Sequence, residues 1–276
     1  WQMTMEGHLS DLTPTSQNSG HGAPRLAFLL LFACVIGCTS REVIVRGNPP
    51  KPLLDPLPII VGVIYPSAFA QHEVFFEARD RADSDWRVKT GEAQVEFWDI
   101  LFEGMFDEVV HIRDWETVQS RGPEIDGVLI PAIADLQYTI PNHTNVNIYE
   151  IWMRYEFRLV DVAAIHQQED GALSFNPDDS LAVWPITAYG KTPTALLQSA
   201  EEAVNLAAVV ALRDAGAHFV TTFGSTPDVA VWLDSIARRE QDAALSSNDA
   251  AGAPEPVTSP TEAPTANNEP DSGEAL

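Results

Sequence analysis

The sequence predicts a single α+β or α/β domain in which two or three helices pack on a mixed, mainly antiparallel sheet. Three observations lead to this fold class. Hydrophobic residues make up 45% of the 276 residues, which is enough to build a buried core. Segments with the two-residue period of strands occur together with segments of helical period. Their order is strand, helix, four strands and two helices, and together they occupy residues 59–240.

A buried strand and a helix open the predicted domain. Residues 59–65 (IIVGVIY) are mostly β-branched and apolar, without polar alternation, which is typical of a strand buried on both faces and central in its sheet. Residues 66–87 have mixed charge and poor periodicity, which indicates a long loop or a ragged strand. A short strand is expected over 107–112. A helix is expected over residues 92–106, just before this short strand. Its apolar side chains recur at helical spacing, namely Val95, Trp98, Leu101, Phe102 and Met105.

Three strands are expected in the middle of the chain. Residues 127–138 begin with an apolar run, and residues 151–159 alternate strictly, with apolar side chains at every odd position. This alternation is typical of a half-buried antiparallel strand. Residues 167–180 are polar and predict a hairpin connection, and the returning strand covers 181–189. Pro185 lacks a backbone donor, so we expect that strand at the edge of the sheet.

Two helices complete the domain. Ser199 and Glu202 have the spacing of a capping box, so a helix should begin there and run to about Ala215, before Gly216. A second amphipathic helix is expected over 227–239. The first helix has a stripe of small residues that lets it lie close on a sheet, formed by Ala200, Ala203, Val204, Ala207, Val210 and Ala211.

The C-terminal segment, 241–276, has a different composition. It is rich in Ala, Pro, Ser, Thr, Asn and acidic residues, and it contains no Lys, Arg or aromatic residue. Such a segment cannot bury enough apolar surface to offset the entropy of ordering. The sequence therefore predicts a disordered acidic tail.

The charge and the cysteines exclude several functions. The formal net charge is −24, which repels phosphate backbones and anionic lipid headgroups, so we expect no nucleic-acid partner. Cys34 and Cys38 are the only cysteines. The chain after Cys38 therefore forms no internal disulfide and offers no thiolate to a metal.

An apolar run of export-signal length precedes the domain. Arg25 is followed by residues 26–38 (LAFLLLFACVIGC), which are apolar without interruption. A membrane-spanning helix needs roughly 20 such residues, whereas the apolar region of a secretory signal needs about 7 to 15. The run therefore predicts a signal peptide within a leader over 1–37. A short uncleaved anchor or a buried apolar segment is the alternative.

The end of this run, Val35, Ile36, Gly37 and Cys38, resembles the bacterial lipobox. The resemblance implies recognition of the first three residues by the lipoprotein signal peptidase and cleavage before Cys38. It also implies a diacylglycerol joined to the cysteine sulfur as a thioether and, in many bacteria, a third acyl chain of the palmitate type on the same residue. It also implies transfer to the outer membrane, facing the periplasm, because Thr39 rather than aspartate follows the cysteine. Residues 38–58 are polar and rich in proline, and predict a semi-rigid tether between lipid and domain.

The order of elements, together with Cys38, is similar to that of periplasmic assembly and activator lipoproteins, such as the curli-secretion lipoprotein and the activators of peptidoglycan synthases. The resemblance implies a non-catalytic envelope lipoprotein that assists assembly of a secretion, transport or cell-wall complex. The partners would be the membrane, through the lipid at Cys38, and an envelope protein. A periplasmic carrier for a lipid or another apolar ligand is the alternative, and no feature specifies an oligomeric state.

No motif for catalysis, metal or cofactor binding is present. The sequence lacks G-x-S-x-G and the glycine-rich loops that bind nucleotides. Adjacent acidic residues are expected at random in so acidic a chain. The histidines after Cys38 have no metal-ligand spacing, and they are His72, His111, His143, His166 and His218. We therefore expect no catalytic residue, no metal and no cofactor.

One face of the alternating strand is a candidate interface. Trp152, Arg154 and Arg158 lie opposite its apolar face, and Trp184 lies on the returning strand. Aromatic and arginine side chains are enriched at protein interfaces. The alternative is that a helix covers this face, which would place both tryptophans in the core.

Overall fold

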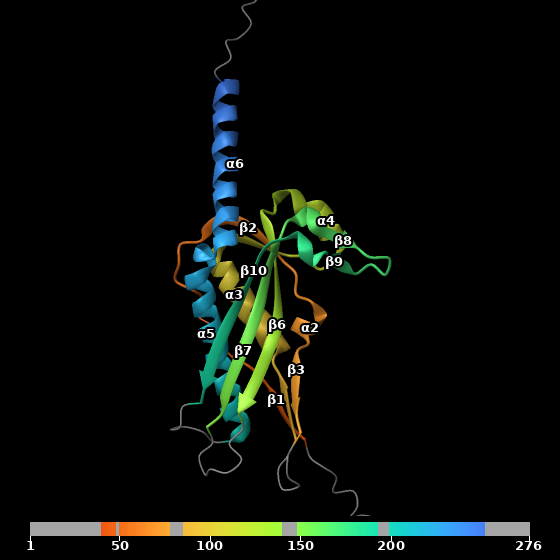
Figure 1. Cartoon of the computed structure of the whole chain (residues 1–276), viewed down its shortest axis with the longest axis vertical. Helices are drawn as coiled ribbons and strands as arrows, with labels where there is room; N and C mark the ends of the chain where they lie inside the picture. Colours follow the sequence, from red (N-terminus) through yellow and green to blue (C-terminus); the bar gives the residue numbers. More distant parts are fainter. Residues whose placement is uncertain (1–39, 48–49, 78–84, 140–147, 193–198, 252–276) are drawn as a thin grey trace, which may run out of the picture.

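A five-stranded mixed sheet carries the helices of the structure in an α+β arrangement (Figure 1). The structure is a computed structural model that describes residues 40–47, 50–77, 85–139, 148–192 and 199–251. Within these residues there are five α-helices and, beside the main sheet, a three-stranded sheet and a two-stranded hairpin. The predicted α+β class is confirmed.

The strands of the main sheet are arranged in the order β10-β7-β6-β2-β5. β2 (Leu57–Val63) lies between β5 (Phe106–His111) and β6 (Gly127–Thr139) and is parallel to both. β7 (Glu150–Val160) and the edge strand β10 (Ser180–Lys191) continue the sheet with antiparallel pairing. The predicted central position of the first apolar strand and the predicted edge position of the last strand are both confirmed.

An aromatic core joins one face of this sheet to α3 (Gly91–Met105) and α5 (Ala200–Thr222). Trp98 of α3 is fully buried at its centre. Its ring centroid lies 4.8 Å from that of Phe157 on β7 and 5.4 Å from that of Phe219 on α5. The side chain of Trp98 therefore links α3 to the sheet and to α5.

The small-residue stripe of α5 packs closely on β10, as predicted. Ala203, Ala207 and Ala211 are fully buried. Gly190 of β10 meets this stripe with its backbone, and a Cβ there would lie 2.5 Å from the amide nitrogen of Ala211 and closer still to the carbonyl oxygen of Ala207. The helix and the strand can approach this closely only because position 190 has no side chain.

The expected result of Gly190→Ala is a loss of about 1 to 3 kcal/mol in the free energy of unfolding, because the added methyl must push backbone against backbone. Urea denaturation of the purified domain measures this loss. Gly224→Ala is the matched control, since a Cβ at Gly224 meets no atom within 4 Å. Equal stability of the two variants would contradict the close packing.

The edge of the sheet at β10 is closed by side chains of α5. The backbone N–H of Tyr189 donates to Oδ2 of Asp214 (2.9 Å), and Nδ1 of His218 lies 2.7 Å from the carbonyl oxygen of Thr187. Pro185, on the same side of the strand, has no N–H to offer. Some backbone groups at this edge are therefore already in contact with side chains of α5, and position 185 has no backbone donor.

Several segment boundaries differ from the predicted ones. Residues 66–87 contain α2 (Ser67–Ala70), β3 (Glu73–Phe76) and the first part of β4 (Trp86–Lys89) rather than one loop. The polar connection 167–180 contributes to a small hairpin of β8 (Ile165–Gln167) and β9 (Leu173–Phe175). This hairpin and α4 (Trp115–Arg121) cover the other face of the sheet near β2, β5 and β6.

The predicted tether is wrong over its first part. β1 (Arg41–Ile44) pairs in parallel with β4 in the three-stranded sheet β1-β4-β3. Val43 and Val45 are buried in the main core. Although the surrounding stretch is polar and rich in proline, the alternating valines at 43 and 45 hold this short segment against the domain.

The two last helices are longer than predicted. α5 continues past Gly216 because this glycine is a packing position and not a cap: a Cβ there would lie 2.5 Å from the ring of Phe97. The segment Ala200–Ser225 is long and apolar enough to cross a membrane, but half of its most apolar window is buried, as in a core helix.

The helix α6 (Pro227–Ala251) projects beyond the sheet (Figure 1). Val229, Trp232 and Ile236 hold its first turns in the core. The predicted tail is therefore wrong over residues 241–251, which are helical, and the rest of the tail lies outside the described residues.

Candidate functional site

The predicted lipidation site lies next to the described domain but outside the described residues. This applies to Cys38 and to the signal-peptidase recognition residues Val35, Ile36 and Gly37. Arg41 follows Cys38 by three residues and is fixed on the domain. Its guanidinium pairs with Glu201 (3.2 Å) and lies 5.3 Å from the ring centroid of Trp86.

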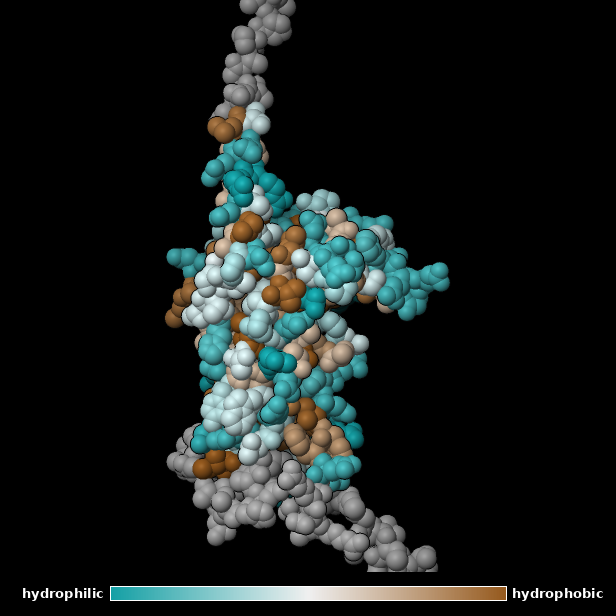
Figure 2. Space-filling model, in the orientation of Figure 1, coloured by the Kyte–Doolittle hydropathy of each residue, from teal (hydrophilic) through white to brown (hydrophobic). Residues whose placement is uncertain are grey.

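The candidate interface lies on what we call the outer face, the side of β6, β7 and β10 that points away from α3 and α5. Figures 1 and 2 look onto this side, where apolar patches alternate with polar ones. Strand register places its side chains in rows across the three strands. The rows are Tyr189, Trp152 and Gln137, then Thr187, Arg154 and Asp135, then Pro185, Glu156 and Ala132.

An aromatic pair is the main feature of the outer face. Trp152 and Tyr189 are 40% and 37% exposed, and their ring centroids lie 4.9 Å apart. In the next row Arg154 is exposed, and it makes no ion pair or side-chain hydrogen bond with another described residue. Arg158 is partly buried and pairs with Glu156 (2.6 Å). Among the described residues, the face thus offers two rings and a guanidinium without a partner.

Trp184 does not belong to this face, and its predicted role at an interface is wrong. It is 4% exposed and stacks on Phe157 in the core, with ring centroids 5.7 Å apart. The register pairs Trp184 with Phe157, which points inward, whereas Tyr189 pairs with Trp152. Each of the two alternatives therefore holds for one tryptophan. Trp152 is exposed, whereas Trp184 lies in the core.

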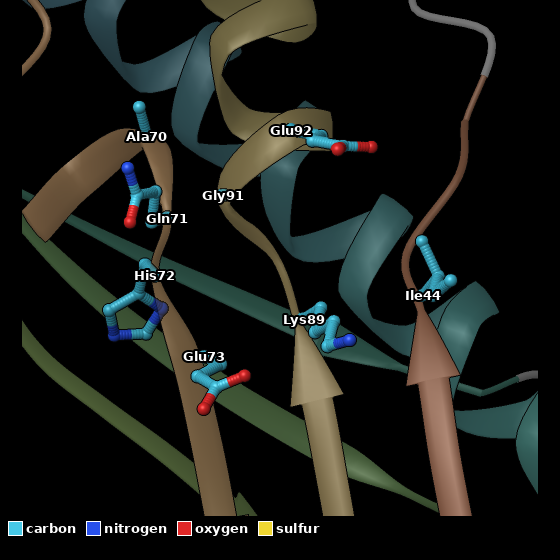
Figure 3. Close-up of a pocket in the computed structure, with 8 residues that line it drawn as sticks. All are labelled: Ile44, Ala70, Gln71, His72, Glu73, Lys89, Gly91 and Glu92. Atoms are coloured by element: carbon cyan, nitrogen blue, oxygen red, sulfur yellow. The ribbon is translucent and has the colours of Figure 1, made fainter. Parts of the chain in front are cut away.

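A first cavity, of about 500 Å³, opens at the carboxyl ends of β1 and β4, where α3 begins (Figure 3). Nδ1 of His72 lies 2.8 Å from the hydroxyl of Thr90, and burial lowers the pKa of this histidine. In Figure 3 the ring of His72 points away from the carboxylates of Glu73 and Glu92. The polar groups do not converge on one point, so this cavity lacks the arrangement of a binding site.

A second cavity, of about 650 Å³, lies at the carboxyl ends of the parallel strands β2 and β5. The hydroxyl of Tyr65 donates to Oδ1 of Asp99 (2.6 Å), and Nδ1 of His111 lies 3.7 Å from the same oxygen. Burial, then the hydrogen bond to Asp99, raises the pKa of Tyr65 far above its usual range. The tyrosine is therefore a permanent donor that orients the carboxylate.

No sequence motif predicts this cluster. Tyr65 lies two residues after β2 and His111 is the last residue of β5, while Asp99 lies on the polar face of the helix between these strands. In parallel α/β sheets, ligands bind beyond the carboxyl ends of the strands. Polar residues at those strand ends were the available signal. Within the described residues, no group of three or more His, Cys, Asp or Glu side chains could hold a metal ion.

No protein-family model and no curated protein matches the chain. Among solved structures, a Xanthomonas campestris protein of family DUF330 aligns at 11% identity over 67% of this chain and 96% of its own, with a TM-score of 0.38. A Caulobacter crescentus protein provisionally named a lipoprotein aligns at 14% identity over 43% and 75%, with a TM-score of 0.26. The PelC dodecamer from Paraburkholderia phytofirmans aligns at 18% identity over 62% and 97%, with a TM-score of 0.27. TM-scores this low do not establish a shared fold, and the chain is assigned to no family.

Proposed function

We propose that the chain is a bacterial envelope lipoprotein, anchored in the outer membrane through Cys38 and facing the periplasm. Its domain would assist the assembly of a secretion, transport or cell-wall complex by binding an envelope protein, without catalysing a reaction. The observation that carries this proposal is the exposed pair of Trp152 and Tyr189 beside Arg154, whose side chain has no partner in the described part of the chain. Aromatic and arginine side chains contribute most of the binding energy at protein interfaces.

The rigidity of the outer face supports this role. Trp152 and Arg154 lie in the middle of the antiparallel part of the sheet, with a paired strand on each side. Side chains held on such a sheet lose little backbone freedom on binding, which lowers the entropic cost of association. The outer face is therefore pre-organised for a partner.

The position of Arg41 supports a short connection to the membrane. Three residues of extended chain reach at most about 10 Å, so lipid at Cys38 would hold the amino end of β1 close to the bilayer. The projecting end of α6 lies at the opposite end of the molecule (Figure 1). The outer face extends between these two ends, where a neighbouring envelope protein can reach it.

Photo-crosslinking in living cells tests the proposed interface. A benzophenone amino acid at position 152 or 189 should capture one and the same envelope protein, and the same probe at Val231 should not. Val231 is the matched control because it is 65% exposed on α6, away from the outer face. Arg154→Glu should lower the crosslinking yield at position 189 by about tenfold or more, as for a central interface residue.

The charge-reversal control is Arg46→Glu, at another exposed arginine with no side-chain partner among the described residues. This variant should crosslink as the unaltered protein does. Crosslinks to lipid alone, equal capture from position 231, or equal losses in the two arginine variants would each contradict the proposed interface.

The alternative of an apolar carrier receives less support. Both cavities are lined by charged side chains, among them Glu73 and Lys89 in the first and Asp99 and Arg113 in the second. A lipid chain in either cavity would strip water from these groups without replacing their hydrogen bonds, at a cost of several kcal/mol.

A further inference from the structure

The second cavity has the size and position of a small-molecule site. Its volume of about 650 Å³ lies within the range of roughly 300 to 1,000 Å³ that is usual for ligand pockets. It lies where the chain turns from β2 to α2 and leaves β5 for α4, beyond the carboxyl ends of two parallel strands. Residues Ala172 and Leu173 of the β8–β9 hairpin also line it.

One end of the cavity carries a negative charge held in place. The carboxylate of Asp99 accepts the hydrogen bond of Tyr65 through Oδ1, and His111 approaches the same atom. The side chain of Asp99 is still 26% exposed. No hydrogen bond within the described residues uses its Oδ2, so this oxygen can accept a donor from a ligand.

A positive charge lines the same cavity. Arg113 lies two residues after β5 and is exposed. It makes no ion pair or side-chain hydrogen bond with another described residue, although acidic residues outnumber basic ones by 40 to 16 in this chain. An arginine left unpaired at a cavity can bind a carboxylate with two parallel hydrogen bonds.

The rest of the lining is mainly aliphatic. It includes Val63, Ile64, Val95, Ile112 and Leu173. A simple anion would be repelled by Asp99, and a simple cation by Arg113. A ligand with a negative group, a positive group and a compact apolar body would match Arg113, Asp99 and the aliphatic part of the lining, respectively.

We infer that this cavity binds a small zwitterion of the amino-acid type. Its carboxylate pairs with Arg113, its ammonium group donates to Asp99, and an aliphatic side chain packs on the wall that includes Val95. Tyr65 is a positioning residue, because its hydroxyl orients the carboxylate of Asp99 from within the protein. This site is separate from the outer face and does not depend on the proposed interface.

Isothermal titration of the purified full-length protein with L-leucine tests the inference. Two analogues each remove one charge: leucinamide lacks the carboxylate, and 4-methylpentanoate lacks the ammonium group. Each should bind about tenfold or more weakly than leucine, as for the loss of a charge-assisted pair. No measurable binding of leucine, or equal affinity for all three compounds, overturns the inference.

Two variants assign the charges to their residues. Arg113→Gln should weaken leucine binding about tenfold or more, and it should not weaken binding of the cation leucinamide, which Arg113 repels. Asp99→Asn should weaken binding of leucine and leucinamide but not of 4-methylpentanoate. Arg46→Gln, away from the cavity lining, is the control that should bind like the unaltered protein.

Circular dichroism of each variant separates lost binding from lost folding. Arg113 is exposed and packs in no core cluster, so Arg113→Gln keeps the test valid even if Asp99→Asn unfolds the domain. Tyr65→Phe, which keeps the ring and removes the donor, should weaken leucine binding less than Asp99→Asn does. Undiminished leucine binding by folded Arg113→Gln overturns the assignment.

Discussion

Cys38→Ala is expected to abolish lipidation of the protein completely. Intact mass spectrometry of membrane-extracted protein should show a chain that begins at Cys38 and carries acyl groups. The variant should lack this species, because alanine has no sulfur to carry the lipid. Each buried methylene of an acyl chain contributes about 0.8 kcal/mol to membrane binding, so two or three chains anchor a protein durably. The variant should therefore also lose its lipid-borne attachment to the outer membrane.

Cys34→Ala is the matched control for this experiment. Cys34 lies in the same apolar run, four residues before Cys38. This variant should be cleaved and lipidated as the unaltered chain is. An unmodified protein that retains residues 26–37 would overturn the lipoprotein assignment and leave the outer face without its proposed location.

Trp98→Ala is expected to lower the free energy of unfolding by about 3 to 5 kcal/mol. The removed indole is fully buried and contacts Phe102, Phe157 and Phe219 at centroid distances of 4.8 to 5.6 Å. These neighbours belong to α3, β7 and α5, so no single element can move to fill the space. Thermal unfolding should show the melting temperature reduced by on the order of 10 °C.

Trp152→Ala is the control for the core substitution. This tryptophan is partly exposed on the outer face, so its loss should change stability by no more than about 1 kcal/mol. Equal destabilisation by both substitutions would mean that the outer face is covered in solution. It would therefore contradict the free interface as well as the assignment of the core.

Patterns within single segments predicted most of the fold. The alternation over 151–159 corresponds to the observed strand β7. The helical spacing over 92–106 corresponds to the observed helix α3. Each of these signals is local, because one face of a half-buried element is repeatedly apolar. The central strand over 59–65 is predicted by a different local signal, an apolar run without alternation, because both of its faces are buried.

Relations between segments could not be predicted in this way. Trp184 was placed on the wrong face because β10 is apolar on both sides, with Trp184 inward and Tyr189 outward. A shift of one residue in register exchanges the two faces of a strand, and the β8–β9 hairpin between the paired strands conceals the register. The cavity groups Tyr65, Asp99 and His111 come together only through the parallel order of β2 and β5.

Local composition was misleading where a few residues dock on a distant element. Arg41–Ile44 lies in a proline-rich stretch, yet its pairing with β4 and the burial of Val43 make it part of the domain. Residues 241–251 have the composition of a tail, yet they continue a helix whose first turns are held by Trp232. The first segment is ordered by its own tertiary contacts, and the second continues a helix that tertiary contacts hold only at its start.

The partly occupied edge of β10 affects how neighbouring copies of the protein can associate. Lipid anchors confine proteins to two dimensions, where their local concentration is high and exposed strand edges readily join into intermolecular sheets and fibrils. Asp214 and His218 occupy backbone groups at this edge, and Pro185 interrupts its donors. If the chain is lipid-anchored as proposed, neighbouring copies are therefore less able to share strands through β10.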